Sequence, residues 1–273
     1  MRRYALVTGA NRGLGLECVK TILTRAPEVY QLLLCSRSKH AGEQAVRNLP
    51  TSLHDRVNVI ELDVTSARSI TAAVAAVESI TPSLQILVNN AGILEGDQTL
   101  ATNFDAVRNV TEAFMPLLLK PSEPSEPSMV TTTSSSCGTR FLASLSPADA
   151  SVLTDDKLTV ENLISKISDL SEAPDLDIYS LSKCAVNCYT QILARSYPQQ
   201  LYVTAVSPGF TNTGMCANYT GTRKSKEVEL GGTVFYEALF GVGRNHTGVF
   251  YKQNSSAGTP LAEAETIETA WST

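Results

Sequence analysis

Short apolar runs that suit β-strands alternate with longer segments of helical period along most of this chain. Strands separated by helices favour a parallel sheet, because each connecting helix covers one face of it. The alternation predicts an α/β fold: a doubly wound parallel sheet of about seven strands, with helices on both faces. We expect strands near residues 3–8, 31–36, 57–62, 85–89, 129–134, 202–206 and 248–251.

The first of these runs leads into a glycine-rich turn. Tyr4–Val7 is followed by TGANRGLG at 8–15, and a helical pattern then continues to Leu23. Glycines let the backbone approach a ligand closely, and the start of a helix offers unpaired N–H groups and a positive dipole end to a pyrophosphate. The spacing is GxxxGxG and differs from the general GxGxxG fingerprint. The turn therefore indicates a dinucleotide site only together with a second signal.

A tyrosine and a lysine four residues apart give that second signal. Tyr179 and Lys183 would share one face of a helix. The ordinary pKa of tyrosine is about 10, so a tyrosine that transfers protons near neutral pH needs a positive charge beside its phenolate. The pair predicts a general acid, although the same spacing also fits a surface tyrosine beside a solvated lysine.

Five motifs follow one another along the chain: TGANRGLG at 8–15, NNAG at 89–92, a serine-rich strand end at 134–136, YSLSK at 179–183 and PGFTNTGM at 208–215. In this order they resemble the short-chain dehydrogenase/reductase family over almost the whole chain. The stretch TNFDAVRNV at 102–110 is similar to the NADPH-dependent carbonyl reductase branch. The resemblance implies a Rossmann-type sheet in a single domain over 1–273. It also implies an insertion at about 139–177. The polar, acidic composition of about 260–273 indicates a tail that could be mobile.

Charge at the end of the second strand bears on the cofactor. Enzymes selective for NAD place a carboxylate there to bind the ribose 2′-hydroxyl, whereas a 2′-phosphate needs a cation. Ser36 and Arg37 close this strand without an acid, and Arg12 in the glycine turn offers a second guanidinium. We therefore expect NADPH/NADP⁺ as the cofactor. The alternative is that both arginines are only solvated.

The resemblance implies further contacts with the cofactor. Asp63 matches the family's adenine-contacting aspartate, and Thr213 matches the residue that contacts the carboxamide. The expected cofactor-binding residues are Gly9, Asn11, Arg12, Gly13, Leu14, Gly15, Ser36, Arg37, Asp63, Val64, Asn90, Ala91, Gly92, Tyr179, Lys183, Pro208, Gly209, Thr211 and Thr213.

The resemblance also implies four catalytic residues. Tyr179 would donate its proton to the carbonyl oxygen, while Lys183 would bind the nicotinamide ribose and lower the pKa of Tyr179. Ser135 would hydrogen-bond to the substrate oxygen and polarise it. Asn103 would hold a water in a proton relay from Lys183.

The choice of serine has one alternative. Residues 131–136 read TTTSSS, and a strand rich in Ser and Thr can reflect β-propensity alone. The family pattern SSxxG, with Gly138 as its glycine, selects Ser135 and leaves Ser136 as the alternative.

Composition argues against several other classes of protein. A net charge of −5 and an isoelectric point near 5.3 argue against binding of nucleic acid, which requires a basic surface. Three scattered histidines, and six cysteines without a CxxC pattern, give no metal site. No apolar run is long enough to span a bilayer, and no signal-peptide core precedes the first strand. We therefore expect no membrane partner and a cytoplasmic location.

The sequence predicts NADPH-dependent reduction of an aldehyde, ketone or quinone to the alcohol, with Tyr179 as proton donor. One alternative is an NADP(H)-binding regulatory or scaffold protein of the same fold with little turnover. Another is an NADP-dependent alcohol or steroid dehydrogenase.

The small-molecule substrate is less constrained than the chemistry. Four apolar side chains near the motifs could line a cleft or belong to the core, namely Phe141, Phe210, Met215 and Tyr219. Compared with carbonyl reductases, the segment from Gly92 to Asn103 is short, which would reduce one wall of the cleft. In that branch an insertion similar to 139–177 accompanies a monomer, so we expect a monomer here.

Overall fold

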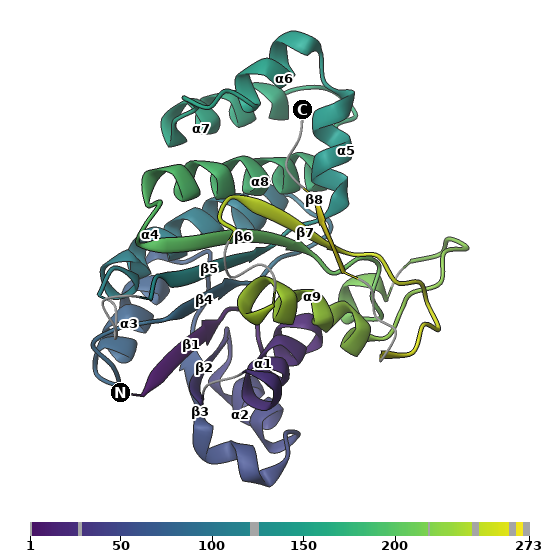
Figure 1. Ribbon diagram of the computed structural model, residues 1–273. Coiled ribbons are helices and arrows are strands. Elements are labelled where there is room, and N and C mark those ends of the chain that lie inside the picture. The colour runs from purple at the N-terminus through teal and green to yellow at the C-terminus, as the bar shows by residue number, and fades with distance from the viewer. Residues whose placement is uncertain are drawn as a thin grey trace.

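Seven parallel strands form the centre of the fold, and an eighth pairs antiparallel with the last of them (Figure 1). The computed structural model describes residues 2–26, 29–120, 126–217, 219–241, 246–261 and 266–269. The strands are β1 (Arg3–Val7), β2 (Tyr30–Ser36), β3 (Val57–Glu61), β4 (Ile86–Asn89), β5 (Ser128–Thr133), β6 (Leu201–Ser207), β7 (Val249–Gln253) and β8 (Thr266–Thr269). Their spatial order is β3-β2-β1-β4-β5-β6-β7-β8. The predicted doubly wound parallel sheet is confirmed.

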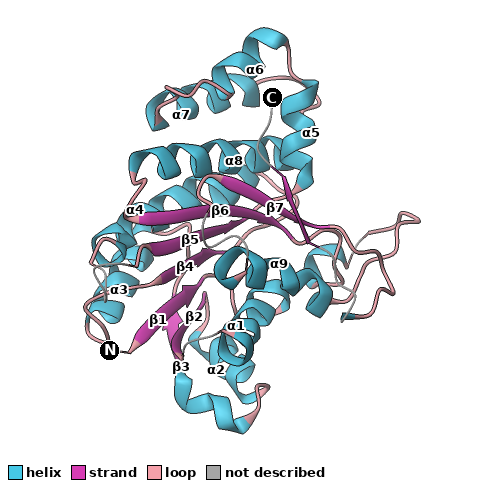
Figure 2. Cartoon of the chain, in the orientation of Figure 1, coloured by secondary structure: helices cyan, strands magenta, loops and turns pink. Residues whose placement is uncertain are grey.

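Helices cover both faces of this sheet, as Figure 2 shows. One face carries α1 (Gly13–Arg25), α2 (Lys39–Arg47) and α9 (Val228–Phe240). The other carries α3 (Ala67–Glu78), α4 (Ala106–Leu118) and α8 (Ile178–Ser196). A 3₁₀ segment, Thr51–Arg56, leads into β3. Within the described ranges no helix is both long and apolar enough to cross a membrane.

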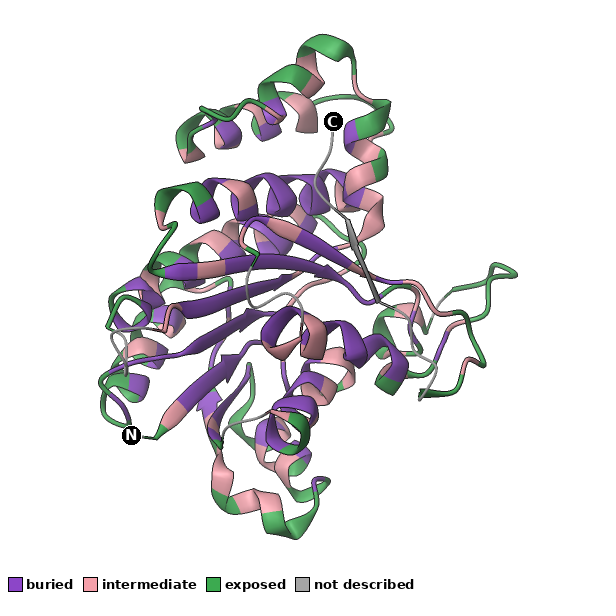
Figure 3. Ribbon diagram, viewed as in Figure 1, coloured by how far each residue is buried: buried purple, intermediate pink, exposed green. Residues whose placement is uncertain are grey.

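The strands β1, β2 and β4 are mainly apolar on both sides, because both of their faces are buried (Figure 3). Successive side chains of a strand point to opposite faces. In β1, Tyr4 and Leu6 join the cluster under α3, α4 and α8, whereas Ala5 and Val7 join the cluster under α1, α2 and α9. The near-continuous apolar runs of the sequence follow from this two-sided cover.

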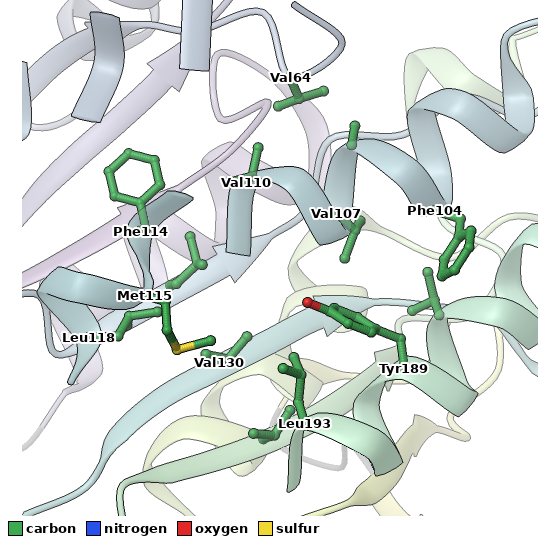
Figure 4. Packing of buried hydrophobic residues seen from close by; sticks show 14 of the residues in the cluster. Val64, Phe104, Val107, Val110, Phe114, Met115, Leu118, Val130, Tyr189 and Leu193 are labelled. Atoms are coloured by element: carbon green, nitrogen blue, oxygen red, sulfur yellow. The ribbon is translucent and has the colours of Figure 1, made fainter. Parts of the chain in front are cut away.

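The cluster beneath α4 and α8 also anchors the segment that precedes α4 (Figure 4). Phe104 meets Tyr189 of α8 edge to face, with ring centroids 6.5 Å apart. Val107 and Val110 of α4 are buried in the same cluster. Packing of this kind fixes the start of α4 against α8, where site residues lie on both elements.

The insertion forms three helices, α5 (Ser136–Ser144), α6 (Pro147–Leu153) and α7 (Val160–Ser171). Leu163 and Ile167 are buried on α7, which packs against α8. Figure 1 shows α6 and α7 on the far side of α8 from the sheet. On this face of the sheet, the insertion therefore adds an outer layer of helices that covers α8.

The last strand falls within the segment that the sequence leaves as a tail. Thr266–Thr269 pairs with β7 in the register Phe250 with Thr269 through Gln253 with Thr266. Residues 262–265 and 270–273, including Trp271, lie outside the described residues. The sequence does not predict β8, because TIET is short and has a single apolar residue.

Candidate active site

The motifs gather where β1, β4, β5 and β6 end at the same edge of the sheet. The strand order changes direction between β1 and β4, because β2 lies on one side of β1 and β4 on the other. In open α/β sheets ligands bind at such a switch point, outside the carboxyl ends of the strands. The topology alone therefore places the site in the loops after these four strands.

The glycine turn after β1 is locked to the end of β4. Gly9 and Gly13 have φ of +61° and +55°, a region that side chains other than glycine rarely adopt. A Cβ on Gly15 would lie 2.5 Å from both Gly9 O and Asn90 Nδ2. The glycines are thus required by the turn itself, and their bare backbone is also what a pyrophosphate needs.

Asn90 and Thr8 hold that turn in place. The Asn90 side chain donates to Thr8 O at 3.0 Å and to Gly9 O at 3.3 Å. In return the Thr8 hydroxyl oxygen accepts the N–H groups of Asn90 and Ala91, at 2.9 and 3.0 Å. Asn90 therefore shapes the glycine turn by contacting it, and Thr8 is a partner that the motifs did not single out. Of the remaining turn residues Asn11 and Leu14 are half-buried.

The ends of β2 and β3 carry the groups expected around the adenosine. Ser36 is buried and Arg37 is exposed. Asp63 accepts hydrogen bonds from Thr65, which hold the pKa of its carboxyl below the ordinary value, and the nearby Arg37 charge acts in the same direction. Val64 is buried in the core. The end of β2 thus presents the exposed Arg37 cation, with the Asp63 carboxylate at the end of β3 near it.

Arg12 lies on another side of the turn. It is exposed, and a Cβ on Gly214 would be 3.5 Å from its Nη1 atom. Its guanidinium therefore lies beside the loop that follows β6. Whether Arg12 joins Arg37 around one phosphate stays a prediction.

Tyr179 stands in the first turn of α8, beside the end of β5. Asp177 caps this helix by accepting the N–H of Ser180 at 3.0 Å. Tyr179 and Ser135 share a hydrogen bond, which lowers the pKa of Tyr179, but burial is the larger effect and raises that pKa to about 12. The net shift is opposite to the one expected from Lys183, because desolvation of the phenolate dominates. Tyr179 is therefore protonated at neutral pH, the state that a proton donor needs.

Lys183 is buried one turn further along α8. Its side chain is 5% exposed, and Nζ donates to the carbonyl oxygen of Thr133 at 2.8 Å. Nζ is 5.6 Å from the centre of the Tyr179 ring. Burial lowers the pKa of Lys183 to about 8. The ammonium thus lies under the tyrosine ring, without a carboxylate among its hydrogen-bond partners.

Asn103 occupies a π-helical turn, Ala101–Asp105, that precedes α4. It is fully buried, accepts the N–H of Ile93 at 2.9 Å and donates to Ile93 O at 2.8 Å. Its amide nitrogen also donates to the Ser182 hydroxyl at 3.1 Å. Asn103 therefore links the loop after β4 to α8, and its expected contact with a relay water remains a prediction. Turns of this kind are common at functional sites.

Two glycines allow these elements to meet. A Cβ on Gly92 would lie 2.9 Å from Asn103 Oδ1 and 3.8 Å from Lys183 Nζ. A Cβ on Gly138 would lie 2.5 to 2.7 Å from backbone atoms of Lys183 and Cys184. Gly138 thereby lets α5 cross α8 closely enough for Ser135, which caps α5, to reach Tyr179.

Their contacts distinguish the two serine candidates, Ser135 and Ser136. Ser135 accepts the N–H of Cys137 at 3.1 Å and bonds with Tyr179. The backbone N–H of Ser136 donates to the Ser207 hydroxyl at 3.2 Å, and the two hydroxyls are 3.4 Å apart. The geometry therefore favours Ser135 as the partner of Tyr179.

The loop after β6 reaches back to the glycine turn. Pro208 and Thr211 are buried, and Gly209 has φ of +81°. A Cβ on Gly13 would lie 3.4 Å from Thr213 Cγ2, so the two predicted cofactor motifs face each other. This loop closes one side of the site.

Aromatic side chains follow in the same loop. The rings of Phe210 and Tyr219 are 4.7 Å apart, edge to face, and the Arg223 guanidinium lies 5.4 Å from the Phe210 ring centre. Met215 and Tyr219 are exposed, at 44% and 49%. By contrast, Phe141 packs partly against the hydrophobic core. Met215 and Tyr219 are therefore more exposed to solvent than Phe141.

Two further residues support the site and have no motif that singles them out. Asn187 accepts the Ser134 hydroxyl at 2.7 Å, which ties α8 to the end of β5. Asn187 lies four residues after Lys183, so its position on the same helix face was a usable signal. Lys226 is buried beside Gly209, although the polar run around it indicates a solvated lysine.

Comparison with known proteins extends these observations. Residues 3–147 match the family described as short chain dehydrogenase. The (+)-neomenthol dehydrogenase of Arabidopsis thaliana is 30% identical over 258 residues, covering 78% of this chain and 84% of that protein. Carbonyl reductase [NADPH] 1 of Rattus norvegicus is 27% identical over 266 residues, covering 87% and 91%.

A solved structure gives the same result for the fold. Salutaridine reductase from Papaver somniferum superposes with a TM-score of 0.77 and 25% identity, covering 91% of this chain and 99% of that one.

Among the described residues, no three His, Cys, Asp or Glu side chains gather in a way that could hold a metal ion. The site geometry, the matched family and relatives of similar length together show that this chain belongs to the short-chain dehydrogenase family of oxidoreductases.

Proposed function

We propose that this protein is an NADPH-dependent carbonyl reductase that converts an aldehyde, ketone or quinone to the alcohol. The observation that carries the proposal is the constellation at the end of β5: a protonated Tyr179, hydrogen-bonded to Ser135, with the buried Lys183 ammonium below its ring. Relatives with names such as carbonyl reductase and salutaridine reductase support the same reaction class.

The residues present fit NADPH. The left-handed glycines of the turn leave backbone accessible to a pyrophosphate, and the exposed Arg37 offers a cation at the end of β2, where the strand itself ends without an acid. Asp63 and the segment Asn90–Gly92 lie at the ends of β3 and β4, where the adenosine is expected. When bound, NADPH supplies the hydride that adds to the carbonyl carbon.

The protein's own groups supply the rest of the chemistry. Ser135 donates a hydrogen bond to the carbonyl oxygen and orients it. Tyr179 transfers its proton to that oxygen, which completes the alcohol and leaves a phenolate. The Lys183 ammonium stabilises this phenolate, and its burial strengthens the interaction because water does not screen it. Asn103 holds the loop after β4 against α8 so that these groups keep their positions.

The proposed substrates are small or medium apolar carbonyl compounds. The exposed side chains of Met215 and Tyr219 and the ring of Phe210 offer an apolar surface in the loop next to the site. The short segment between Gly92 and Asn103 leaves fewer residues for the opposite wall. We also propose that the protein is a monomer, since the insertion covers α8.

The test of the function is Tyr179→Phe. NADPH oxidation is followed by absorbance with quinones, dicarbonyls, aromatic aldehydes and steroid ketones, and NADPH binding is followed by fluorescence. The variant should lose about 100- to 10,000-fold in kcat, the usual contribution of a general acid, and should bind NADPH as the unmodified protein does. Tyr197→Phe, a tyrosine at the far end of α8, serves as the control and should retain activity.

Other outcomes would favour the alternatives. Binding of NADPH without turnover of any carbonyl compound would favour a regulatory or scaffold protein. Faster oxidation of alcohols with NADP⁺ than reduction of carbonyls would favour an alcohol or steroid dehydrogenase. Turnover that survives Tyr179→Phe would contradict the proposed mechanism.

A further inference from the structure

Lys226 is a buried cation that the proposed chemistry does not use. Its side chain is 4% exposed, in a run of polar residues between the loop after β6 and α9. Nζ donates to Gln253 Oε1 at 2.9 Å and to the carbonyl oxygens of Gln253 and Ser255 at 3.2 Å each. Burial lowers the pKa of this lysine to about 8, and the nearby charges of Arg223 and Lys252 act in the same direction. A buried charge is costly unless it is fully hydrogen-bonded, so three acceptors around one ammonium form a specific arrangement.

The backbone of Lys226 pairs with the loop that follows β6. Its N–H donates to Phe210 O at 3.0 Å, and its carbonyl oxygen accepts the N–H of Asn212 at 2.8 Å. Thr211, between these two, is the bridge partner of Lys226. One residue therefore holds both ends of a three-residue stretch of the loop.

The side chain of Lys226 supports the residue before that stretch. A Cβ on Gly209 would lie 2.7 Å from Lys226 Nζ and 2.9 Å from its Cε. The lysine thus passes directly against the Gly209 backbone, which has φ of +81°. Through Gln253 and Ser255 the ammonium joins this loop to the end of β7.

The far end of the same loop faces the glycine turn. Thr213 lies against Gly13, where a Cβ would be 3.4 Å from Thr213 Cγ2. A shift of the 208–213 segment would therefore move Thr213 relative to the turn that is expected to hold the pyrophosphate. The Lys226 ammonium bonds to Gln253 and Ser255 and not to Tyr179, Ser135 or Lys183, so its influence on the site runs through this loop.

We propose that Lys226 is a positioning residue that fastens the 208–213 loop to the end of β7 and thereby sets the affinity for NADPH. The inference rests on the proposed function, because it treats this loop as part of the cofactor site. Its ammonium holds the loop from outside the site and takes no part in proton transfer. The loss of its charge should weaken cofactor binding and leave the chemical step nearly intact.

The first experiment compares Lys226→Met with Lys224→Met, which removes an equal charge from an exposed position in the same run. NADPH affinity is measured by fluorescence titration, and kcat is measured at saturating NADPH with menadione as the probe carbonyl. Because Lys226 makes charge-assisted hydrogen bonds, we expect the Kd for NADPH to rise about 10- to 100-fold in Lys226→Met. The value of kcat should change less than about threefold, because Lys226 does not contact the reacting groups. Lys224→Met should change neither quantity.

The second experiment does not depend on the cofactor. Hydrogen exchange of the unliganded protein should be faster in peptides that cover 208–217 in Lys226→Met and unchanged in β1, β4 and β5. If Lys226→Met does not fold, Lys226→Gln keeps a shorter donor and should show a smaller rise in Kd.

The outcomes separate this inference from the proposed function. If the unmodified protein does not bind NADPH, the proposed function is overturned. Hydrogen exchange would still show whether Lys226 fastens the 208–213 loop to the end of β7. Normal NADPH affinity in Lys226→Met, or equal exchange of the 208–217 peptides, would overturn the inference. A loss of kcat without a change in Kd would overturn it as well.

Discussion

Burial moves the pKa values of Tyr179 and Lys183 in opposite directions. The phenolate and the ammonium are both charged forms that lose hydration, so the pKa of Tyr179 rises to about 12 and that of Lys183 falls to about 8. Below pH 8 the tyrosine is protonated and the lysine is charged, and these are the two states that proton donation to a carbonyl oxygen requires. The pair is therefore suited to reduction, in which Tyr179 gives up a proton.

This leads to a prediction for the pH profile. As pH rises through about 8, Lys183 loses its proton while Tyr179 keeps its own, so kcat/KM for NADPH should fall above about pH 8. The quantity kcat/KM reports the ionisations of the free protein. Steady-state rates at pH 6.5 to 10, with a saturating quinone, measure the profile. The decline should persist in Lys226→Met, and a profile that stays flat to pH 10 would contradict the role given to Lys183.

Arg37 gives a second prediction at the scale of a residue. Arg37→Asp places a carboxylate where a 2′-phosphate is expected, so the KM for NADPH should rise about 10- to 100-fold and preference should shift toward NADH. Arg47→Asp, an exposed arginine on α2, provides the matched charge control and should keep the preference for NADPH. Equal discrimination between the cofactors in Arg37→Asp and in the unmodified protein would show that Arg37 is only solvated.

Among the elements, the crossing of α5 and α8 is the contact on which the site depends most. Gly138→Ala would push a Cβ to 2.5 Å from the backbone of Lys183. Because the neighbouring atoms are backbone, the helices must separate, and overpacking of this kind costs about 1 to 3 kcal/mol of stability. The separation should also pull Ser135 from Tyr179, so kcat should fall while NADPH affinity changes little.

Thermal unfolding and steady-state kinetics test this prediction together. Ser144→Ala is the control, since Ser144 lies on α5 with an exposed side chain and bonds only within its own helix. It should keep both stability and kcat. A Gly138→Ala protein with unchanged melting temperature would mean that α5 and α8 can separate at no cost.

Elements of the fold differ in how far the sequence reveals them. The strands β1 to β7 each contain apolar residues between helices, and in β1, β2 and β4 the apolar run is nearly continuous because both faces are buried. The segment 139–177 shows helical spacing at Leu163, Ile164 and Ile167, and these residues lie in α7. By contrast, β8 depends on pairing with β7, a long-range contact without a local signal.

The same distinction applies to the site. Tyr179, Lys183 and the glycine turn have fixed local spacings, so the sequence indicates them. Asn187 shares a helix face with Lys183, which is a local signal, but its hydrogen bond to Ser134 and that of Lys226 to Gln253 join residues far apart along the chain, and no local pattern reveals these bonds. The direction of the Tyr179 pKa shift was likewise unpredictable, because it depends on how much of the ring is buried.

For the whole molecule, the insertion leads to a prediction about assembly. Leu163 and Ile167 of α7 are buried, and α7 packs against α8, so the apolar surface of α8 away from the sheet is already covered within one chain. Size-exclusion chromatography with light scattering should give the mass of one 273-residue chain at both low and high protein concentration. A mass of two or four chains would contradict the monomer.

The order of the strands has a consequence for how the protein is made. In space β1 lies between β2 and β4, and from β4 onward each strand lies beside the one synthesised before it. Chains are synthesised from the N-terminus, and each domain folds as a unit. Every strand after β1 therefore emerges when one of its neighbours already exists, and none has to enter between two strands that are already joined. The sheet can grow at its borders in the order in which the ribosome delivers its strands.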